Sequence, residues 1–289
     1  MNFFDLHCDL PYECYTKNIL PDDPALAANI NQNLFFDKWD QFFAVWIKDD
    51  EKDSFNKYKK IINSFKDKLE NAKNKPKAHF ALEGGAALEN DIDNVNRLYD
   101  DEIEYITLTW NYKNNLAGGT YETGGITSFG KSVIHRMNDL SIACDLSHSN
   151  DETFFQALDI SKYPFVSHSC LKEITNHPRN FSIFQIKKLF ERGGIFGICF
   201  YPEFAGKGDI FERIFENLYS LLELGYPGNI AIGSDFDGAL TDKSLEKSSD
   251  TLKLYEYLLK KGIDKELLNG IFYKNAFDYF KKLSERKNK

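Results

Sequence analysis

The sequence predicts an α/β fold, and within that class a (β/α)₈, or TIM, barrel. Short apolar segments alternate with amphipathic segments along the 289 residues. Strict alternation of strands and helices forms a parallel sheet, and about eight such units at this length favour a closed barrel. No Ser- or Pro-rich linker and no internal repeat interrupts the alternation. We therefore expect residues 1–289 to form one domain.

The predicted strands are short apolar runs that end at polar or glycine-containing segments. They cover residues 3–6, 41–47, 78–82, 105–109, 142–146, 165–167, 195–200 and 230–232. Pro11 is expected to stop the strand that opens the chain, and a polar connection should follow it to about residue 40. Residues 111–128 are rich in Asn, Gly and Thr and predict a long loop.

The predicted helices lie between these strands and at the C-terminal end. In residues 51–73, apolar side chains recur at helical spacing along one face of the segment. Similar reasoning predicts helices over residues 91–100, 130–140, 151–160, 182–192, 210–224, 249–261 and 265–283.

Composition and charge exclude several classes of partner. The net charge of −8 and the pI near 5.4 argue against nucleic acid or an anionic membrane as a partner. No apolar run approaches the roughly 18–20 residues of a transmembrane helix, and the first residues do not resemble a signal peptide. The five cysteines form no Cys-x-x-Cys motif and suit reduced thiols. We expect a cytoplasmic protein.

Residues with metal-binding or acid–base side chains follow five of the predicted strands. They are His7, Asp9, Glu83, His148, His168 and Asp235. A (β/α)₈ barrel brings the carboxyl ends of its strands together on one face, where active sites are built. In the segment 7–9, strand alternation places the imidazole and the carboxylate on one face and Cys8 on the other. The sequence thus predicts a metal-dependent hydrolase type of barrel.

The residue types suggest two metal ions that share a bridging carboxylate. One ion would take His7, Asp9 and one oxygen of Glu83, and the other would take the second oxygen with His148 and His168. Nitrogen and oxygen ligands suit Zn²⁺, with Mn²⁺ or Co²⁺ as alternatives. Two such ions hold a shared water as hydroxide and polarise a carbonyl group.

Asp235 would stand beside this hydroxide, where it would take the proton of the water and return it to a leaving amine. The alternative is that Asp235 only caps a turn, a role that its neighbour Asp237 fits better because a glycine follows Asp237.

Taken together, these motifs resemble the membrane (renal) dipeptidase family of binuclear zinc peptidases, in the form of a soluble bacterial-type member. The motifs are Asp5-Leu-His-Cys-Asp-Leu-Pro11, Leu82-Glu-Gly84, Leu108-Thr109, Gly125-Ile-Thr-Ser-Phe-Gly130, Met137-Asn138, Asp145-Leu-Ser-His148, Ser167-His-Ser169, His177-Pro-Arg-Asn180 and Gly233-Ser-Asp-Phe-Asp-Gly238. The resemblance implies the barrel, two zinc ions and hydrolysis of dipeptides. It assigns the same residues to the metals, with Glu83 as a catalytic bridge and Asp235 as the catalytic acid/base that also contacts substrate. A homodimer is implied by the resemblance alone.

Two further residues are expected to contact substrate. A guanidinium group binds a carboxylate through two parallel hydrogen bonds, so Arg179 could hold the free C-terminus of a dipeptide, a role that the resemblance supports. Trp110 follows Leu108-Thr109 at a position where animal members carry a histidine. Because Trp offers a single N–H donor and no acceptor, Trp110 is expected only to form a wall of the pocket.

Two other functions remain open from the sequence. A related barrel amidohydrolase would act on other amides, lactams or esters. Such barrels commonly begin with His-x-His and bridge their metals with a modified lysine, whereas this chain has His-x-Asp and Glu83. The chain could also be a metal-binding barrel without catalysis, but no expected ligand is missing.

Overall fold

Eight parallel strands close into a barrel in the order β1 to β8 in the computed structural model, which describes residues 1–287. The predicted (β/α)₈ fold is therefore confirmed. The strands are β1 (Asn2–Cys8), β2 (Lys38–Trp46), β3 (Lys77–Glu83), β4 (Ile103–Thr107), β5 (Ala143–Asp145), β6 (Pro164–Ser169), β7 (Phe196–Ile198) and β8 (Ile230–Ile232). All pair in parallel with their neighbours, and β8 closes the barrel against β1.

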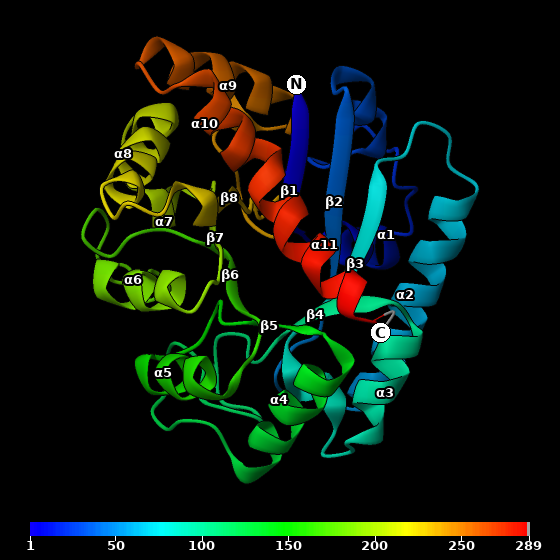
Figure 1. Ribbon diagram of the computed structural model, residues 1–289. Coiled ribbons are helices and arrows are strands. Elements are labelled where there is room, and N and C mark those ends of the chain that lie inside the picture. Colours follow the sequence, from blue (N-terminus) through cyan, green and yellow to red (C-terminus); the bar gives the residue numbers. More distant parts are fainter. Residues whose placement is uncertain (288–289) are drawn as a thin grey trace.

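The helices surround the barrel, as Figure 1 shows. They are α1 (Leu10–Thr16), α2 (Ser54–Glu70), α3 (Asp93–Asp100), α4 (Ser128–Leu140), α5 (Asp151–Ile160), α6 (Ile183–Glu191), α7 (Pro202–Ala205), α8 (Ile210–Leu222), α9 (Thr251–Lys260), α10 (Lys265–Asn269) and α11 (Asn275–Lys287). Among residues 1–287, no helix is both long enough and apolar enough to cross a membrane.

The segment after the first strand differs from its prediction. Residues 10–16 form α1 instead of an irregular connection, and a short 3₁₀ helix covers Ile30–Phe35. Pro11 lies in the first turn of α1, where its missing N–H leaves no helical hydrogen bond unmade and its fixed φ suits the helix. Pro11 therefore starts a helix as the strand ends. Likewise, the predicted helix 265–283 is divided by a π-helical turn at Gly270–Lys274.

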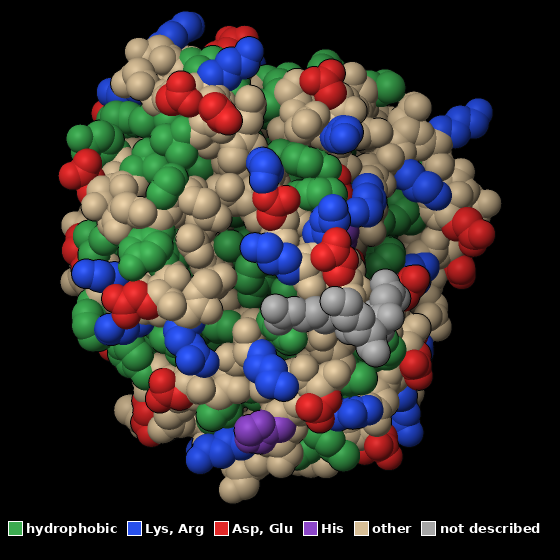
Figure 2. All heavy atoms as spheres, viewed as in Figure 1, with side chains coloured by type: hydrophobic (Ala, Val, Ile, Leu, Met, Phe, Trp, Pro, Cys, Tyr) green, Lys and Arg blue, Asp and Glu red, His purple; other side chains and the backbone are tan. Residues whose placement is uncertain are grey.

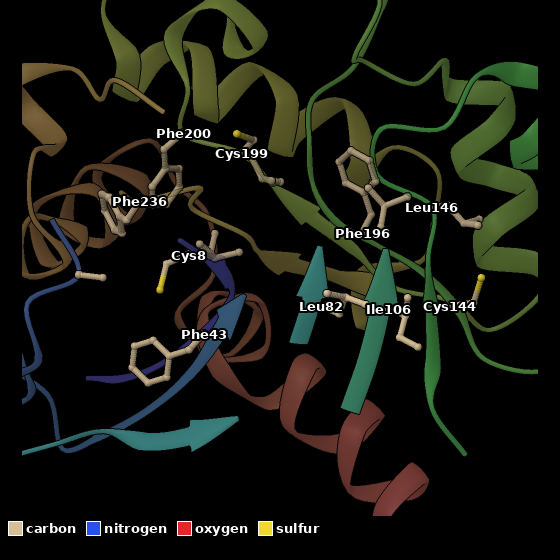
Figure 3. Close-up of a cluster of buried hydrophobic side chains, with 14 of the residues drawn as sticks. Cys8, Phe43, Leu82, Ile106, Cys144, Leu146, Phe196, Cys199, Phe200 and Phe236 are labelled. Atoms are coloured by element: carbon tan, nitrogen blue, oxygen red, sulfur yellow. The ribbon is translucent and has the colours of Figure 1, made fainter. Parts of the chain in front are cut away.

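Two apolar clusters build the core. Side chains between the strands and the surrounding helices form the larger cluster, part of which is drawn in Figure 3 with Phe43, Leu82 and Ile106 among its members. The smaller cluster fills the barrel and consists of Phe4, Leu6, Phe42, Ala44, Ala81, Tyr105, Ala143, Phe165, Ile195, Ala231, Ala276, Phe280 and Leu283. Cys8 belongs to the larger cluster, on the helix side of β1.

Helix α11 closes the end of the barrel at which the strands begin. Figure 1 shows it lying across the strands at this end. The Phe280 ring lies 4.5 Å from the ring of Phe42 and 5.5 Å from that of Phe165, measured between centroids. On the face drawn in Figure 2, basic and acidic side chains are interspersed around this helix. The opposite end of the barrel, where the strands end, is free for a functional site.

A buried charged cluster reinforces the closed end of the barrel. His79 of β3 has its Nδ1 2.7 Å from Glu104 Oε1 and its Nε2 3.0 Å from Asp40 Oδ1. Tyr273, from the π-helical turn, donates a hydrogen bond to Asp40 Oδ2 at 3.0 Å. The Lys77 ammonium lies 3.2 Å from Asp40 Oδ1. With a carboxylate at each ring nitrogen, the doubly protonated imidazolium is the favoured form of His79.

The pKa values of the pair follow from these contacts. Burial alone would lower the pKa of His79, but hydrogen bonds to Asp40 and Glu104 raise it above 6.5. Burial alone would raise the pKa of Asp40, but His79 and Lys77 hold it below 3.8. The contribution of His79 to stability is fully present below pH 6.5 and is lost as the pH rises through its folded-state pKa.

We expect the substitution His79→Gln to destabilise the protein more at pH 5.5 than at pH 9. The loss should be about 1–3 kcal/mol at the lower pH, because a buried carboxylate loses a charged donor. Chemical denaturation of both proteins at the two pH values measures the difference. His135, exposed on α4, supplies the control substitution His135→Gln. An equal loss at both pH values would contradict the charged state of His79.

Candidate metal centre

The six residues predicted from the strand ends converge at the open end of the barrel. His7 and His168 are the second-last residues of β1 and β6, and Glu83 is the final residue of β3. Asp9, His148 and Asp235 follow β1, β5 and β8, respectively. All six residues are buried.

Irregularities in two strands aim the histidines inward. Leu6 already faces the barrel interior, so strict alternation would turn His7 outward. The pairing register of β1 instead shifts between Asp5 and Cys8, which returns His7 to the interior and leaves Cys8 outside. The register of β6 shifts in the same way between Val166 and Ser169. Such β-bulges re-aim side chains beside active sites.

Glu83 lies at the centre of the cluster, and its two oxygens face different sides. Its Oε2 lies 3.5 Å from His7 Nε2, and that nitrogen is also 3.5 Å from Asp9 Oδ2. Its Oε1 lies 2.8 Å from His148 Nε2 and 3.8 Å from His168 Nε2. The ligand atoms of His7, Asp9 and Glu83 all lie within 4.8 Å of one another, and so do those of Glu83, His148 and His168.

Neighbouring groups set the tautomer of His7. Tyr105 lies in β4, and its hydroxyl donates its proton to the Leu6 carbonyl oxygen at 3.0 Å. The hydroxyl oxygen, 2.9 Å from His7 Nδ1, must therefore accept a hydrogen bond from the protonated Nδ1. The Nε2 atom, which points toward the carboxylates of Asp9 and Glu83, would offer its lone pair to a cation bound there. With no cation bound, burial lowers the pKa of His7, but Tyr105 and Glu83 raise it well above 6.5 overall.

The same reasoning applies to the other two histidines. The Nδ1 atom of His148 lies 2.9 Å from the amide oxygen of Asn111, which can only accept. The Nδ1 atom of His168 lies 2.8 Å from the hydroxyl of Ser167, whose own proton is donated to Asp145 at 2.7 Å. Both rings therefore present an Nε2 lone pair to Glu83, the arrangement found in metal-binding histidines.

The lone pairs of His148 and His168 and the oxygens of Glu83 form a buried group of acceptors, which fits a bound cation. His148 Nε2 lies 3.1 Å from His168 Nε2 and 2.8 Å from Glu83 Oε1, contacts between acceptors that repel unless a positive charge lies between them. His7 Nε2 and Asp9 Oδ1 are buried without hydrogen-bond partners. Asp9 also occupies the N-cap of α1 without capping it.

The backbone is constrained where two of these residues lie. His148 has φ +67° and Asp235 has φ +64°, in the left-handed region that non-glycine residues rarely adopt. A side chain at Gly238 would place its Cβ 2.0 Å from Asp9 Oδ2 and 2.6 Å from Asp235 Oδ1, so only glycine fits there. Strained backbone of this kind is concentrated at functional sites.

Asp235 and Asp237 have different surroundings. Burial raises the pKa of Asp235 to about 8, and the carboxylates of Asp9 and Glu83 add to the rise. Asp237 accepts hydrogen bonds from the backbone N–H groups of Ala27 and Ala28 at 2.7 and 2.9 Å. Asp237 therefore holds the distant segment 27–28 and is not seen to cap its own turn, the role that the sequence suggested. Asp235 lies beside the cluster, with its Oδ1 atom 3.9 Å from His7 Nε2.

A cavity of about 510 Å³ opens above the cluster. Asp9, Glu83, His148 and Asp235 lie in its wall, together with Trp46, Trp110, His177, Arg179 and Phe204. Arg179, 2 % exposed, donates from Nη2 to His168 Nε2 at 2.9 Å, but its Nε and Nη1 atoms have no hydrogen-bond partner. The Trp110 ring lies beside that of His148, with 6.3 Å between centroids.

Two buried carboxylates that the sequence analysis did not single out support the site, one in each half. The first is Asp5. Asp5 accepts hydrogen bonds from the His7 backbone N–H, from the backbone N–H and hydroxyl of Ser234, and from the Gln41 amide. It therefore fixes the strand ends that carry His7 and Asp235. The spacing of Asp5 two residues before His7 was the available signal for this role.

The second carboxylate, Asp145, fixes the ends of β5 and β6 through hydrogen bonds. Its oxygens accept from the backbone N–H groups of Ser147 and Ser167 and from the hydroxyls of Ser167 and Thr107, at 2.6–3.0 Å. These bonds hold the residues that immediately precede His148 and His168. Tyr105 and Asn111 were also missed, because nothing in their local sequence marks them as partners of a histidine.

We expect the substitution Asp145→Asn to weaken zinc binding about 10–100-fold, the range seen when groups that orient metal ligands are removed. An asparagine would set its amide N–H₂ against N–H and O–H donors. Competition with a zinc-sensitive dye would measure the affinity. Asp40→Asn, which alters a buried aspartate at the closed end of the barrel, is the matched control. A folded Asp145→Asn protein with unchanged zinc affinity would contradict the prediction.

Comparisons with known proteins identify the family of the chain. A model of the membrane dipeptidases (peptidase family M19) matches residues 52–289, so it includes Glu83, His148, His168 and Asp235 and begins after His7 and Asp9. The chain is 31% identical over 203 residues to dipeptidase verJ of Clonostachys rogersoniana, covering 68% of this chain and 52% of that protein. It is 29% identical over 229 residues to an uncharacterized dipeptidase of Schizosaccharomyces pombe, covering 76% and 56%. The chain spans about half the length of these relatives.

Solved structures share the barrel. A metallopeptidase of Rhodobacter sphaeroides, liganded with a phosphinate mimic of L-Ala-D-Ala, superposes with a TM-score of 0.84 at 16% identity, over 97% of this chain and 99% of that one. The probable dipeptidase PvdM of Pseudomonas aeruginosa gives a TM-score of 0.85 at 13% identity, over 99% and 96%. At sequence identities this low, the similarity shows a common fold and nothing more. The match to the family model covers most of the sequence, and the chain belongs to the membrane dipeptidase family, peptidase family M19.

Proposed function

We propose that the chain is a zinc-dependent dipeptidase with two metal ions in the cluster around Glu83. The observation that carries the proposal is a buried group of unprotonated acceptors facing a cavity that also contains a partly unpaired guanidinium group. Membership of the dipeptidase family supports it. The cytoplasmic location and the homodimer expected from the sequence stay predictions.

The ligands divide into two sets that share one carboxylate. His7, Asp9 and Glu83 Oε2 would hold one ion, and Glu83 Oε1, His148 and His168 the other. Nitrogen and oxygen donors suit Zn²⁺, and Mn²⁺ or Co²⁺ would also bind them. When bound, such a pair of ions supplies an activated water and polarises the scissile carbonyl group.

Arg179 would bind the C-terminal carboxylate of the substrate. Its guanidinium is buried, which lowers its pKa from the usual value, and two of its nitrogens lack acceptors. One lone pair of His168 cannot serve both Arg179 and a cation, so occupation of the second metal position would free Nη2 as well. A carboxylate then offers the two acceptors that a guanidinium prefers.

Asp235 would carry the proton during the reaction. Its carboxylate would accept a proton from the attacking water and deliver it to the amine nitrogen of the departing residue. A pKa of about 8 keeps this group able to hold a proton near neutral pH, while cations bound beside Asp9 and Glu83 would lower it toward the value a base needs. Trp110 would form a wall of the cavity, as the sequence suggested.

We expect the chain to cleave dipeptides and to lose this activity on chelation, with recovery on addition of zinc. Asp235→Asn should lower kcat by about 10²–10⁴-fold, the range for removal of a general acid/base, while zinc binding is retained. Glu83→Gln should lose both activity and metal, because an amide cannot bridge two cations. A panel of L,L and L,D dipeptides, with metal analysis of each variant, measures these effects.

The alternatives predict different results from the same panel. Two bound metals with no cleavage of any dipeptide would reject the proposal and direct the search to other amides, lactams or esters. A protein that binds metals and leaves all of these substrates intact would be a barrel without catalysis.

We expect Arg179→Met to raise KM for dipeptides by about 10–100-fold, because it removes a charged donor pair worth roughly 1.5–3 kcal/mol. The same substitution should leave a dipeptide amide, which has no carboxylate, almost unaffected. Steady-state kinetics on Ala-Ala and Ala-Ala-NH₂ make the comparison. An equal loss on both substrates would contradict carboxylate binding by Arg179.

A further inference from the structure

Three aromatic rings form one continuous wall of the cavity. We call the set of Tyr12, Trp46 and Trp110 the aromatic wall. The ring of Trp46, at the end of β2, lies 4.8 Å from that of Tyr12 in α1 and 5.0 Å from that of Trp110, measured between centroids. All three residues line the cavity above the metal cluster. They come from positions 12, 46 and 110, so only the fold brings them together.

The aromatic wall begins beside the cluster of candidate metal ligands, and hydrogen bonds hold it there. Trp110 lies beside His148, and its neighbour Asn111 accepts the hydrogen bond that orients that histidine. Asp49, just after β2, accepts hydrogen bonds from the backbone N–H groups of Trp110 and Tyr112 at 3.4 and 3.0 Å. The loop that carries Trp110 is therefore hydrogen-bonded both to the end of β2 and to His148 of the cluster.

The residues on the other side of the cluster have a different character. Arg179 contacts His168, and its guanidinium carbon lies 5.2 Å from the centroid of the Phe204 ring. Arg179 contacts His168, His168 contacts His148, and Trp110 lies beside His148, so the two histidines lie between Arg179 and the aromatic wall. A dipeptide with its carboxylate on Arg179 and its peptide carbonyl at the cluster must direct its first residue toward the wall.

We propose that the aromatic wall is the subsite for the side chain of the dipeptide's first residue, and that it selects a large apolar or aromatic side chain there. This inference rests on the proposed dipeptidase function. Flat rings gain most from burying another ring or a long aliphatic chain, through apolar area and edge-to-face contacts. The Trp46 Nε1–H is buried without a hydrogen-bond partner, so the wall presents mostly carbon to a ligand.

The test compares pairs of dipeptides that differ in which residue is large. The expected kcat/KM for Phe-Ala exceeds that for Ala-Ala by about 10–100-fold, the discrimination typical of an apolar pocket. Trp46→Ala should reduce this ratio to about threefold or less, while the ratio for Ala-Phe over Ala-Ala keeps its wild-type value. Trp46→Phe should restore most of the Phe-Ala preference.

The controls separate a subsite from a structural role. Phe184→Ala, which removes an exposed ring on α6 outside the cavity, should leave all ratios unchanged. Zinc content and thermal denaturation report whether Trp46→Ala is folded; if it is not, Trp46→Leu and Trp110→Leu replace it and should also lower the Phe-Ala ratio.

Each outcome has a distinct meaning. Cleavage of Phe-Ala and Ala-Ala at equal kcat/KM would overturn the inference and leave the dipeptidase function in place. Preference for Lys-Ala over Phe-Ala, or equal effects of Trp46→Ala on the Phe-Ala and Ala-Phe ratios, would also overturn it. Failure to cleave any dipeptide would instead reject the proposed function on which it rests.

Discussion

The structure depends on one electrostatic constraint, the convergence of unprotonated acceptors on Glu83. The imidazole nitrogens and carboxylate oxygens form groups of three whose ligand atoms lie within 4.8 Å of one another, and the Nδ1 atom of each histidine is hydrogen-bonded to a group outside the cluster. In a buried setting such an arrangement is unfavourable without positive charge, because like dipoles and lone pairs face each other at low dielectric. The divalent cations proposed above would provide that charge, and membership of the membrane dipeptidase family supports the proposal.

Much of the surrounding structure serves to maintain this unfavourable geometry. The bulges in β1 and β6 turn His7 and His168 inward against the alternation of their strands. Asp5 and Asp145 then hold the two halves of the site through buried hydrogen bonds, although neither belongs to the candidate ligand sets. The apolar filling of the barrel and α11 close the opposite end. A rigid scaffold is needed because groups that repel one another drift apart unless their backbones are fixed.

The cavity above the cluster is asymmetric in a way that matches an asymmetric substrate. Its cationic side holds Arg179 against Phe204, and its other side is the aromatic wall. For the proposed dipeptide substrate, which has one carboxylate and two side chains, an anion site and an apolar site on opposite sides of the cluster would fix one orientation. Specificity would then depend on Tyr12, Trp46 and Trp110, none of which is a candidate metal ligand. Trp110 belongs to that apolar side.

The sequence by itself determined the barrel and the positions of the six cluster residues at its strand ends. Strand and helix periodicity is a property of the local sequence. The ability of side chains such as His7 or Glu83 to bind a metal likewise depends only on the residue type. The predicted ends of the strands were accurate enough to place those residues on one face. By contrast, α1 was missed, because a proline after a strand is compatible with a turn or with a helix start.

Only the tertiary structure decided which atom of each residue faces the cluster and what lies around it. The inward turn of His7 depends on a register shift against β2, and its tautomer depends on Tyr105, 98 positions away. The aromatic wall likewise joins rings from helix α1, the end of β2 and the loop after β4. These features arise from contacts between residues far apart in the sequence. The closure of the barrel sets the geometry of these contacts, so they cannot be predicted from the local sequence.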